Sequence, residues 1–528
     1  MQIFDSLTIP ILLIVVLAKY FQQSKSSLVI KSLAVIALVS VAIQLTVEGY
    51  RWQMVPGYIV LAIVVIQCWF AGNNPAQEKL SGWRKFRHLS AVSIALLLVA
   101  SSALFSYLFP MFDLPEPTGS YTVGTSEFHM IDEARPETYT QDTSDKRELM
   151  VRVWYPADKV TDKEPTPYWR EASVRSGELT KGLGMPGFLF NHFGNVETHS
   201  YWDAPLSNAK PNYPVLIFSH GFNLGWASQN TNLMESLASH GYIIFSIDHA
   251  YVGMASIFPD GRVAEFNKQT FTAMSEPPSP EAMAIYEQLS ETSDWREQIA
   301  LLNKANAMMP EGSMDVMNEA LGIWAEDQLF VLSEIEKFQS GEKGSATSKV
   351  LDFKSHLDLS NLGFFGMSFG GSTSLDNCVK DSRCKAGINM DGFMAFQMQL
   401  PPLQKPFMFM NSEDNLFYNA MYEIAESDVY SVRVEGSKHL NYLDFSIMSP
   451  LYQIMGALGP IEGYKMLAIT EDYVLAFFDK YLKDETSALL DESLDGSLDG
   501  SVANSVGKYK EVEFRTKKNK LPRLLRTQ

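Results

Sequence analysis

The sequence predicts an α/β fold, a mostly parallel sheet with helices on both faces, preceded by four transmembrane helices. Three observations lead to this prediction. Long apolar runs fill the first 112 residues, short β-branched runs alternate with helix-like stretches after them, and a Gly-x-Ser-x-Gly motif stands between one such strand and one such helix. The 528 residues are 46% hydrophobic and 20% charged, a composition too apolar for a disordered chain.

Charge and cysteine content exclude several classes of protein. The net charge of −18 argues against a nucleic-acid partner, because phosphate backbones attract clustered lysine and arginine. Three cysteines, Cys68, Cys378 and Cys384, are too few for a disulfide scaffold and form no zinc-binding pattern. We therefore expect no metal and no other cofactor. Cys378 and Cys384 could be bridged or could be two buried thiols, and the sequence does not decide between these states.

Four apolar runs predict a membrane anchor over residues 1–112. They cover roughly residues 7–21, 28–47, 56–70 and 89–109, and each approaches the length of about 20 residues that spans a hydrocarbon core. The runs are apolar all round, whereas helices buried in a soluble domain have a polar face. The first run lacks the basic start of a signal peptide. We expect an integral membrane protein, in the plasma or inner membrane.

The positive charges predict the orientation of this anchor, since short loops rich in lysine and arginine stay in the cytoplasm. The connection with Lys79, Arg84, Lys85 and Arg87 is the most basic, and the first loop is also basic. Both are expected inside. Alternation of the helices then places everything after residue 109 outside the cytoplasm.

Composition divides the rest of the chain in two. Proline and glycine between residues 110 and 119 indicate a linker into an α/β domain over residues 113–483. A long insertion near residues 256–317 has helical patches that could cap a site or face lipid, and ordinary packing explains its methionines equally well. Residues 484–528, an acidic repeat followed by a basic end, are expected to form a flexible tail.

Within the α/β domain, strands and helices follow one another in the order typical of a parallel sheet covered by helices. Strands are predicted at residues 148–155, 215–218, 243–247, 362–365, 386–390, 407–411 and 430–434, and helices at 226–240, 320–338 and 371–379.

The motif Gly366-Met367-Ser368-Phe369-Gly370 is the strongest indication of chemistry. A serine between a strand and a helix matches a nucleophile elbow, in which a strained turn exposes the hydroxyl. Gly366 and Gly370 leave room where side chains would collide with backbone. Ser368 is therefore the predicted nucleophile.

Such a serine needs a histidine base held by an acid, in the chain order serine, acid, histidine. Of nine histidines only His439 follows the serine, in a small-residue loop after a predicted strand. Asp391 follows the strand at 386–390, Asp414 follows the next strand, and Glu413 is its neighbour. Spacing alone leaves the choice of acid open.

An oxyanion hole needs two backbone N–H donors, one of them from the residue after the nucleophile. Phe369 is therefore one candidate. The loop Ser219-His220-Gly221-Phe222 follows an earlier strand, and the N–H of Phe222 is the other. We expect His220 to orient this loop rather than to transfer protons, and Asp248 and His249 to line a pocket or support the fold.

Taken together, these residues resemble the secreted or plasma type of platelet-activating factor acetylhydrolase and its bacterial relatives, within the α/β-hydrolases. The resemblance covers roughly residues 119–477. It rests on YTVG at 121–124, VRVWYP at 151–156, FSHG at 218–221, LASHGY at 237–242, GMSFGG at 366–371, MDG at 390–392 and GSKH at 436–439. It implies that Asp391 is the acid, and that the enzyme releases short or oxidised sn-2 acyl groups from phospholipids without calcium.

The hypothesis is thus a membrane-anchored serine esterase acting on phospholipids or other amphiphilic esters. A general carboxylesterase, a polyester hydrolase or a dienelactone-type hydrolase would use the same triad. A protein of another class, a lipid-binding or sensor membrane protein with an inert hydrolase domain, is the remaining alternative.

Overall fold

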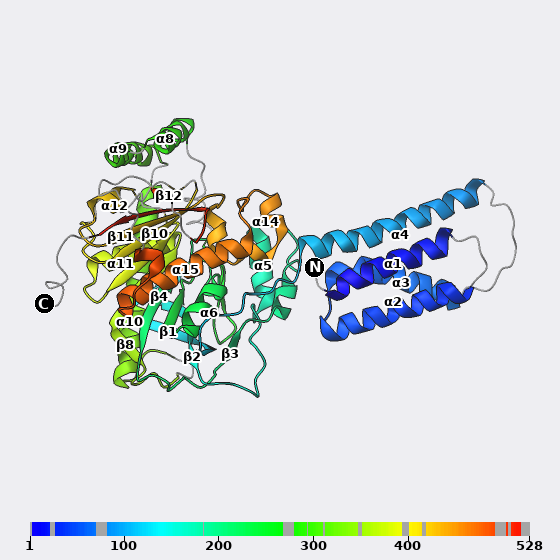
Figure 1. The fold of residues 1–528 in the computed structure, drawn as a ribbon, viewed down its shortest axis with the longest axis horizontal. Coiled ribbons are helices and arrows are strands. Elements are labelled where there is room, and N and C mark those ends of the chain that lie inside the picture. The colour runs from blue at the N-terminus through cyan, green and yellow to red at the C-terminus, as the bar shows by residue number, and fades with distance from the viewer. Residues whose placement is uncertain are drawn as a thin grey trace.

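The computed structural model describes residues 3–21, 27–69, 82–182, 184–267, 279–292, 294–309, 312–346, 351–392, 401–413, 415, 419–491, 503–504 and 508–518. The loops 22–26 and 70–81, Asp414, the acidic repeat and the basic end of the chain lie outside these residues. Figure 1 shows two parts, an arm of N-terminal helices and a body built on one large sheet.

Four helices form where the apolar runs predict them: α1 (Ile3–Phe21), α2 (Ser27–Val47), α3 (Val55–Trp69) and α4 (Gly82–Leu108), with a short 3-10 helix, η1 (Trp52–Met54), before α3. Within the described residues, three helical stretches are long and apolar enough to cross a membrane, Leu28–Val47, Trp52–Trp69 and Lys85–Leu108. The prediction of four spans is corrected to three. The helix left out, α1, carries Asp5 and Lys19 near its ends, and these shorten its uncharged stretch.

Polar contacts join the arm to the body where α4 ends. Asp5 and Arg51 form a fully buried ion pair of 2.8 Å, and the Gln53 side chain donates to the Phe109 carbonyl at 2.8 Å. The indole N–H of Trp52 donates to the carbonyl of Leu189, 3.2 Å away in the body. The bonds made by Gln53 and Trp52 help to fix how the chain leaves the helices and enters the body.

The body contains an eleven-stranded sheet in the order β12-β13-β11-β10-β9-β8-β4-β5-β2-β1-β3. Its strands are β1 (Thr122–Pro136), β2 (Lys146–Ala157), β3 (Ser200–Trp202), β4 (Tyr213–Ser219), β5 (Ile243–Asp248), β8 (Leu357–Met367), β9 (Ala386–Met390), β10 (Phe407–Ser412), β11 (Val429–Val434), β12 (Ala503–Asn504) and β13 (Val512–Lys517). The six central strands, β5 to β11 across the sheet, are parallel, and β2 and β13 join them antiparallel. The predicted α/β class is confirmed.

Helices cover both faces of this sheet, as predicted. The helices of the body are α5 (Ala172–Gly182), η2 (Asn191–Asn195), α6 (Thr231–Ser239), α8 (Pro280–Glu291), α9 (Trp295–Asn306), α10 (Ser313–Ser340), α11 (Phe369–Lys380), α12 (Asn419–Ile424), η3 (His439–Tyr442), α13 (Phe445–Met448), α14 (Pro450–Ile454), α15 (Gly463–Leu482) and α16 (Ala488–Asp491). Successive strand residues point to opposite faces. On β4, Leu216 and Phe218 pack in the core with α6 and α15, and Val215 and Ile217 pack in the core with α10 and α11.

One described part of the C-terminal segment, β13, departs from its prediction. Residues 484–528 are expected to be flexible, yet β13 pairs antiparallel with β11 over Val512–Lys517 and extends the sheet. Val512 and Phe514 are buried in the main core. Two apolar side chains two residues apart lie on the same face of a strand, and an unpaired sheet edge can bind such a strand. The sequence alone does not reveal that β11 offers such an edge.

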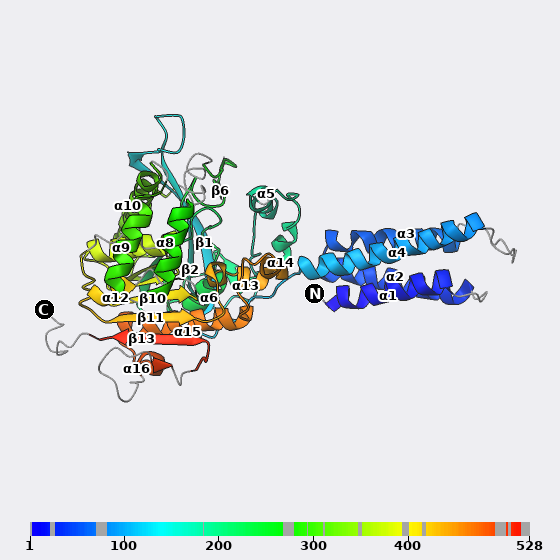
Figure 2. The ribbon, with the colours of Figure 1, turned by 90° about the horizontal axis from the view of Figure 1, so that it is seen from above.

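The insertion near residues 256–317 begins with a small hairpin of β6 (Ser256–Ile257) and β7 (Val263–Ala264) and continues in α8 and α9. Figure 2 shows α8 and α9 side by side next to α12, and α9 contacts α12. Before that pair, the ring of Phe266 lies 5.6 Å from the ring of Phe222. The first part of the insertion therefore contacts the predicted oxyanion loop at Phe222, while α9 packs against α12.

Candidate active site

Ser368 stands between β8 and α11, in the strand-turn-helix setting that the motif predicts. Its backbone has φ +56° and ψ −124°, a positive-φ conformation that non-glycine residues rarely adopt and that stores strain. The Ser368 N–H donates to the carbonyl of Met390 at the end of β9, 2.8 Å away. This bond helps to hold the strained turn, which places the side chain beyond the carboxyl ends of the parallel strands.

The two glycines of the motif are required by close backbone contacts. A Cβ atom on Gly366 would lie 2.3 Å from the backbone of Gly370, and one on Gly370 would lie 2.0 Å from the Ser219 carbonyl oxygen. Neither space can hold a methyl group without moving main chain. The elbow therefore packs directly against the end of β4 as well as against its own helix.

His439 opens η3, after β11, and reaches back to the serine. Its Nε2 lies 2.9 Å from Ser368 Oγ, and its Nδ1 lies 2.7 Å from Asp391 Oδ2. The His439 side chain is 47% exposed, whereas that of Asp391 is only 2% exposed. The structure thus brings Ser368, His439 and Asp391 into one chain of hydrogen bonds that opens to solvent at the histidine.

Asp391 follows β9 directly and is surrounded by donors. Its carboxylate accepts from the N–H and hydroxyl of Ser412 at 2.7 to 2.9 Å, from the Asn415 side chain at 2.9 Å and from His439. Burial alone raises the pKa of Asp391, but the hydrogen bond and charge of His439, with the Ser412 and Asn415 bonds, outweigh it and lower that pKa below its usual value. The carboxylate stays ionised and orients the imidazole.

Of the two rival acids, Glu413 is placed and does not reach the histidine. Its carboxylate accepts from the Gly436 N–H at 2.8 Å and is exposed. Asp414 lies outside the described residues. Ser412 and Asn415, the two residues that hold Asp391, were not singled out in the sequence, because no motif there identifies the partners of a buried carboxylate.

The predicted oxyanion residues lie on either side of Ser368. A Cβ atom on Gly221 would be 3.3 Å from Ser368 Cβ, so the loop leading to Phe222 touches the nucleophile. The Gly370 N–H donates to the His220 carbonyl at 3.0 Å, which ties this loop to α11. The rings of Phe222 and Phe369 are 5.6 Å apart. The role of their N–H groups stays a prediction.

His220 is placed as a loop-orienting residue. Its Nδ1 lies 2.7 Å from the Gly221 carbonyl and donates to it, and its Nε2 accepts from the N–H of His249 at 3.1 Å. Burial, together with the neighbouring His249, lowers the pKa of His220 to about 3. A neutral ring with both nitrogens engaged is a structural support and not a proton carrier.

Cys378, at the end of α11, is bonded to Cys384 in the loop before β9, with their Cα atoms 5.2 Å apart. The sequence leaves open whether these two cysteines are bonded, and the structure has a disulfide between them. Within the described residues, no group of three or more histidine, cysteine, aspartate and glutamate side chains has the arrangement of a metal site.

The segment after His439 contains a buried acid, Asp444, that is expected to make stability depend on pH. Burial raises the pKa of Asp444 to about 8, although the Tyr168 hydroxyl donates to it at 3.0 Å. Between about pH 4 and pH 8 the folded chain therefore holds a proton that the unfolded chain has released, so the free energy of unfolding falls as pH rises.

Asp444→Asn should remove that part of the pH dependence, because an amide stays neutral and still accepts from Tyr168. Urea unfolding of both proteins between pH 5 and pH 8.5 measures it. The variant should gain stability relative to wild type as pH rises, by on the order of a few kcal/mol over the range. Parallel curves for the two proteins would mean that Asp444 is already ionised when folded.

Comparisons with known proteins agree with this geometry. Residues 108–498 match the model of the family described as "Platelet-activating factor acetylhydrolase, isoform II". The platelet-activating factor acetylhydrolase of Canis lupus familiaris is 24% identical over 442 residues, 78% of this chain and 84% of that protein. The protein of the same name from Cavia porcellus is 24% identical over 394 residues, 70% of this chain and 78% of that protein.

A solved structure shares the fold at 22% sequence identity. A ferulic acid esterase from Streptomyces cinnamoneus superimposes with a TM-score of 0.53 over 76% of this chain and 99% of its own. At that identity the likeness bears on fold alone. The family match covers the body up to residue 498, with every residue of the candidate site inside it.

Proposed function

Because this chain belongs to the platelet-activating factor acetylhydrolase, isoform II family, we propose that it is a membrane-anchored, calcium-independent serine esterase that removes short or oxidised sn-2 acyl groups from phospholipids. The observation that carries the proposal is the hydrogen-bond chain from Ser368 through His439 to Asp391, within the matched residues. We further propose that residues 1–112 are the anchor and that the hydrolase unit begins near residue 113.

The separations in the site support a two-step mechanism. As Ser368 Oγ bonds to the ester carbonyl carbon, His439 Nε2 takes its proton, and Asp391 holds the imidazole in the tautomer that can accept. The N–H groups of Phe222 and Phe369 bind the oxyanion. His439 then protonates the leaving glycerol oxygen, whose bond to the carbonyl carbon breaks. Water, deprotonated by His439, releases the acyl group and restores Ser368.

Membrane anchoring and an extracytoplasmic hydrolase unit are parts of the same proposal. Large apolar side chains are exposed on α2, α3 and α4, among them Ile36, Ile66 and Leu97, which are 51%, 57% and 67% exposed. The basic connection before α4 favours a cytoplasmic start of that helix. The Cys378–Cys384 disulfide favours an oxidising compartment on the other side. A protease added to sealed vesicles with the cytoplasmic face outward should leave the body intact. Cleavage of the body would show that it lies on the cytoplasmic side instead.

The substrate is tested with the full-length chain in detergent, given phospholipids that differ only in sn-2 chain length. Acetyl and short chains should be released with or without a calcium chelator, and long chains should not. Equal release of all lengths would favour a general carboxylesterase. Labelling by a fluorophosphonate without phospholipid turnover would support a serine hydrolase but contradict the proposed phospholipid substrate. No reaction in either assay would favour the lipid-binding or sensor alternative.

A further inference from the structure

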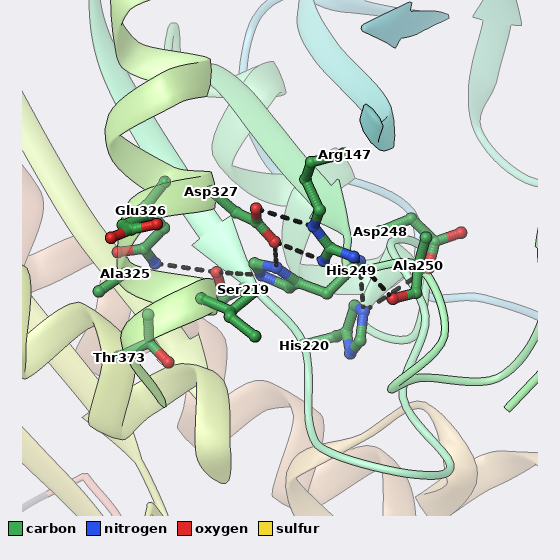
Figure 3. Close-up of polar contacts among 12 residues, drawn as sticks. Arg147, Ser219, His220, Asp248, His249, Ala250, Ala325, Glu326, Asp327 and Thr373 are labelled. Atoms are coloured by element: carbon green, nitrogen blue, oxygen red, sulfur yellow. Dashed lines mark hydrogen bonds and ion pairs between the residues drawn. The ribbon is translucent and has the colours of Figure 1, made fainter. Parts of the chain in front are cut away.

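A second chain of serine, histidine and aspartate is buried beneath the proposed active site. Ser219 Oγ lies 2.9 Å from His249 Nε2, and His249 Nδ1 lies 2.9 Å from Asp327 Oδ2. Ser219 ends β4, His249 follows β5, and Asp327 comes from α10 (Figure 3). All three residues are fully buried. The proposed mechanism uses none of these three side chains.

The charges around this chain fix which atom carries each proton. Asp327 accepts from Arg147 at 2.7 and 3.1 Å and from Arg135 at 2.8 Å, which keeps its carboxylate ionised. Burial lowers the pKa of His249 in spite of Asp327, and both arginines lower it further. A neutral His249 therefore donates from Nδ1 to Asp327 and accepts at Nε2 from the Ser219 hydroxyl.

Ser219 is not a second nucleophile. Its Oγ has no exposed surface and also accepts from the Gln328 side chain at 2.9 Å. The indole of Trp324 stacks on the His249 ring, with the ring centres 3.9 Å apart and the planes within 5°. An ester cannot reach either residue, so the chain can act only through its neighbours.

Those neighbours are the two segments that carry the proposed oxyanion donors. Ser219 immediately precedes His220, whose Nε2 accepts the backbone N–H of His249. On the other side, Gln328 also donates to Ser374 Oγ at 3.1 Å, and Ser374 donates to the Gly370 carbonyl at 2.8 Å in the first turn of α11. The buried chain thus links the loop of Phe222 with the helix start of Phe369.

We propose that Ser219, His249 and Asp327 are positioning residues that hold the Phe222 loop at its working distance from Ser368 and Phe369. The inference rests on the proposed function, because it assumes that the two N–H groups receive the oxyanion. Preorganised donors stabilise a transition state only while their geometry is kept, and small displacements are costly. Loss of the Ser219 hydroxyl removes one hydrogen-bond partner from Gln328 and one from His249, and this lets the loop move.

The test compares Ser219→Ala with Ser246→Ala in the full-length chain, with an aryl acetate ester as substrate. Ser246 is an equally buried serine in neighbouring β5, whose hydroxyl donates to the Ala227 carbonyl at 2.6 Å. Sites are counted by saturating fluorophosphonate labelling. Ser219→Ala should lower kcat per labelled site by about 10- to 100-fold with little change in KM, and slow the labelling itself. Ser246→Ala should match wild type in both.

Three results would overturn the inference: wild-type kcat per labelled site in Ser219→Ala, a loss of labelled sites without a loss of kcat per site, or a Ser219→Ala chain that does not fold. In the last two cases the hydroxyl would serve the fold rather than the loop. Ser368→Ala separates this from the proposed function. If Ser368→Ala is still labelled, the proposed nucleophile is wrong whatever Ser219→Ala does; if it is unlabelled and Ser219→Ala is normal, only the positioning role fails.

Discussion

Ser368→Ala is expected to abolish ester hydrolysis and fluorophosphonate labelling. Without Oγ no acyl-enzyme can form, and His439 has no proton to take. Loss of an activated serine costs on the order of 10⁴- to 10⁶-fold in kcat in comparable triads, the residual rate coming from oxyanion binding alone. Turnover of the aryl acetate and mass spectrometry of the labelled protein measure the two losses.

Folding should survive this substitution, because the lost contact is at the edge of the fold. The bond to Ser368 faces the exposed side of His439, so water can replace the hydroxyl. We expect the free energy of unfolding to change by about 1 kcal/mol or less. Ser219 serves as a comparison within the same protein. It is also hydrogen-bonded to a histidine that binds an aspartate, but it is fully buried, so substrate and label cannot reach it. A label on Ser219 in Ser368→Ala would contradict both assignments.

The nucleophile and the base could be predicted from the sequence, the first by a local motif and the second by its order in the chain. Ser368 is identified by its flanking strand, glycines and helix, and these are contiguous in the chain. His439 is identified by order, since it alone of nine histidines follows the serine. The structure extends the predicted strand at 362–365 to β8, Leu357–Met367, without moving the serine from its end.

The acid could not be chosen by spacing, and the sheet register explains this. β9 and β10 are parallel neighbours, with Met390 opposite Met410, so the residues that follow both strands emerge at the same edge. An acid after either strand can therefore approach the same histidine. The preference for Asp391 came from the resemblance to the acetylhydrolase family, because residue spacing does not distinguish the two acids.

Long-range pairings lay beyond the sequence. Nothing near Asp327 shows that α10 crosses behind β4 and β5 and delivers a carboxylate to His249, 78 residues earlier in the chain. Likewise, β13 becomes a strand because β11 presents a free edge. A helical patch predicts a helix, but the face that it covers depends on how the whole sheet is assembled.

Asp391→Asn is expected to lower kcat by about 10³- to 10⁴-fold while the protein still binds substrate. Every described neighbour of this side chain donates to it, so it must be a carboxylate, which only accepts. An amide would turn one N–H toward a donor and could hold His439 with the proton on Nε2, where it cannot receive the proton of Ser368. Steady-state kinetics with an aryl acetate ester measure the loss.

Glu413→Gln is the matched control, since it removes a neighbouring negative charge that binds Gly436 instead of the histidine. It should retain wild-type kcat. Asp414→Asn completes the comparison, because Asp414 follows the next strand and was the open alternative. If Asp414→Asn is inactive while Asp391→Asn is active, the acid role moves to Asp414. A loss of kcat confined to Asp391→Asn would identify Asp391 as the acid that orients His439. The buried donors around its carboxylate would then explain why an amide of the same shape cannot replace it.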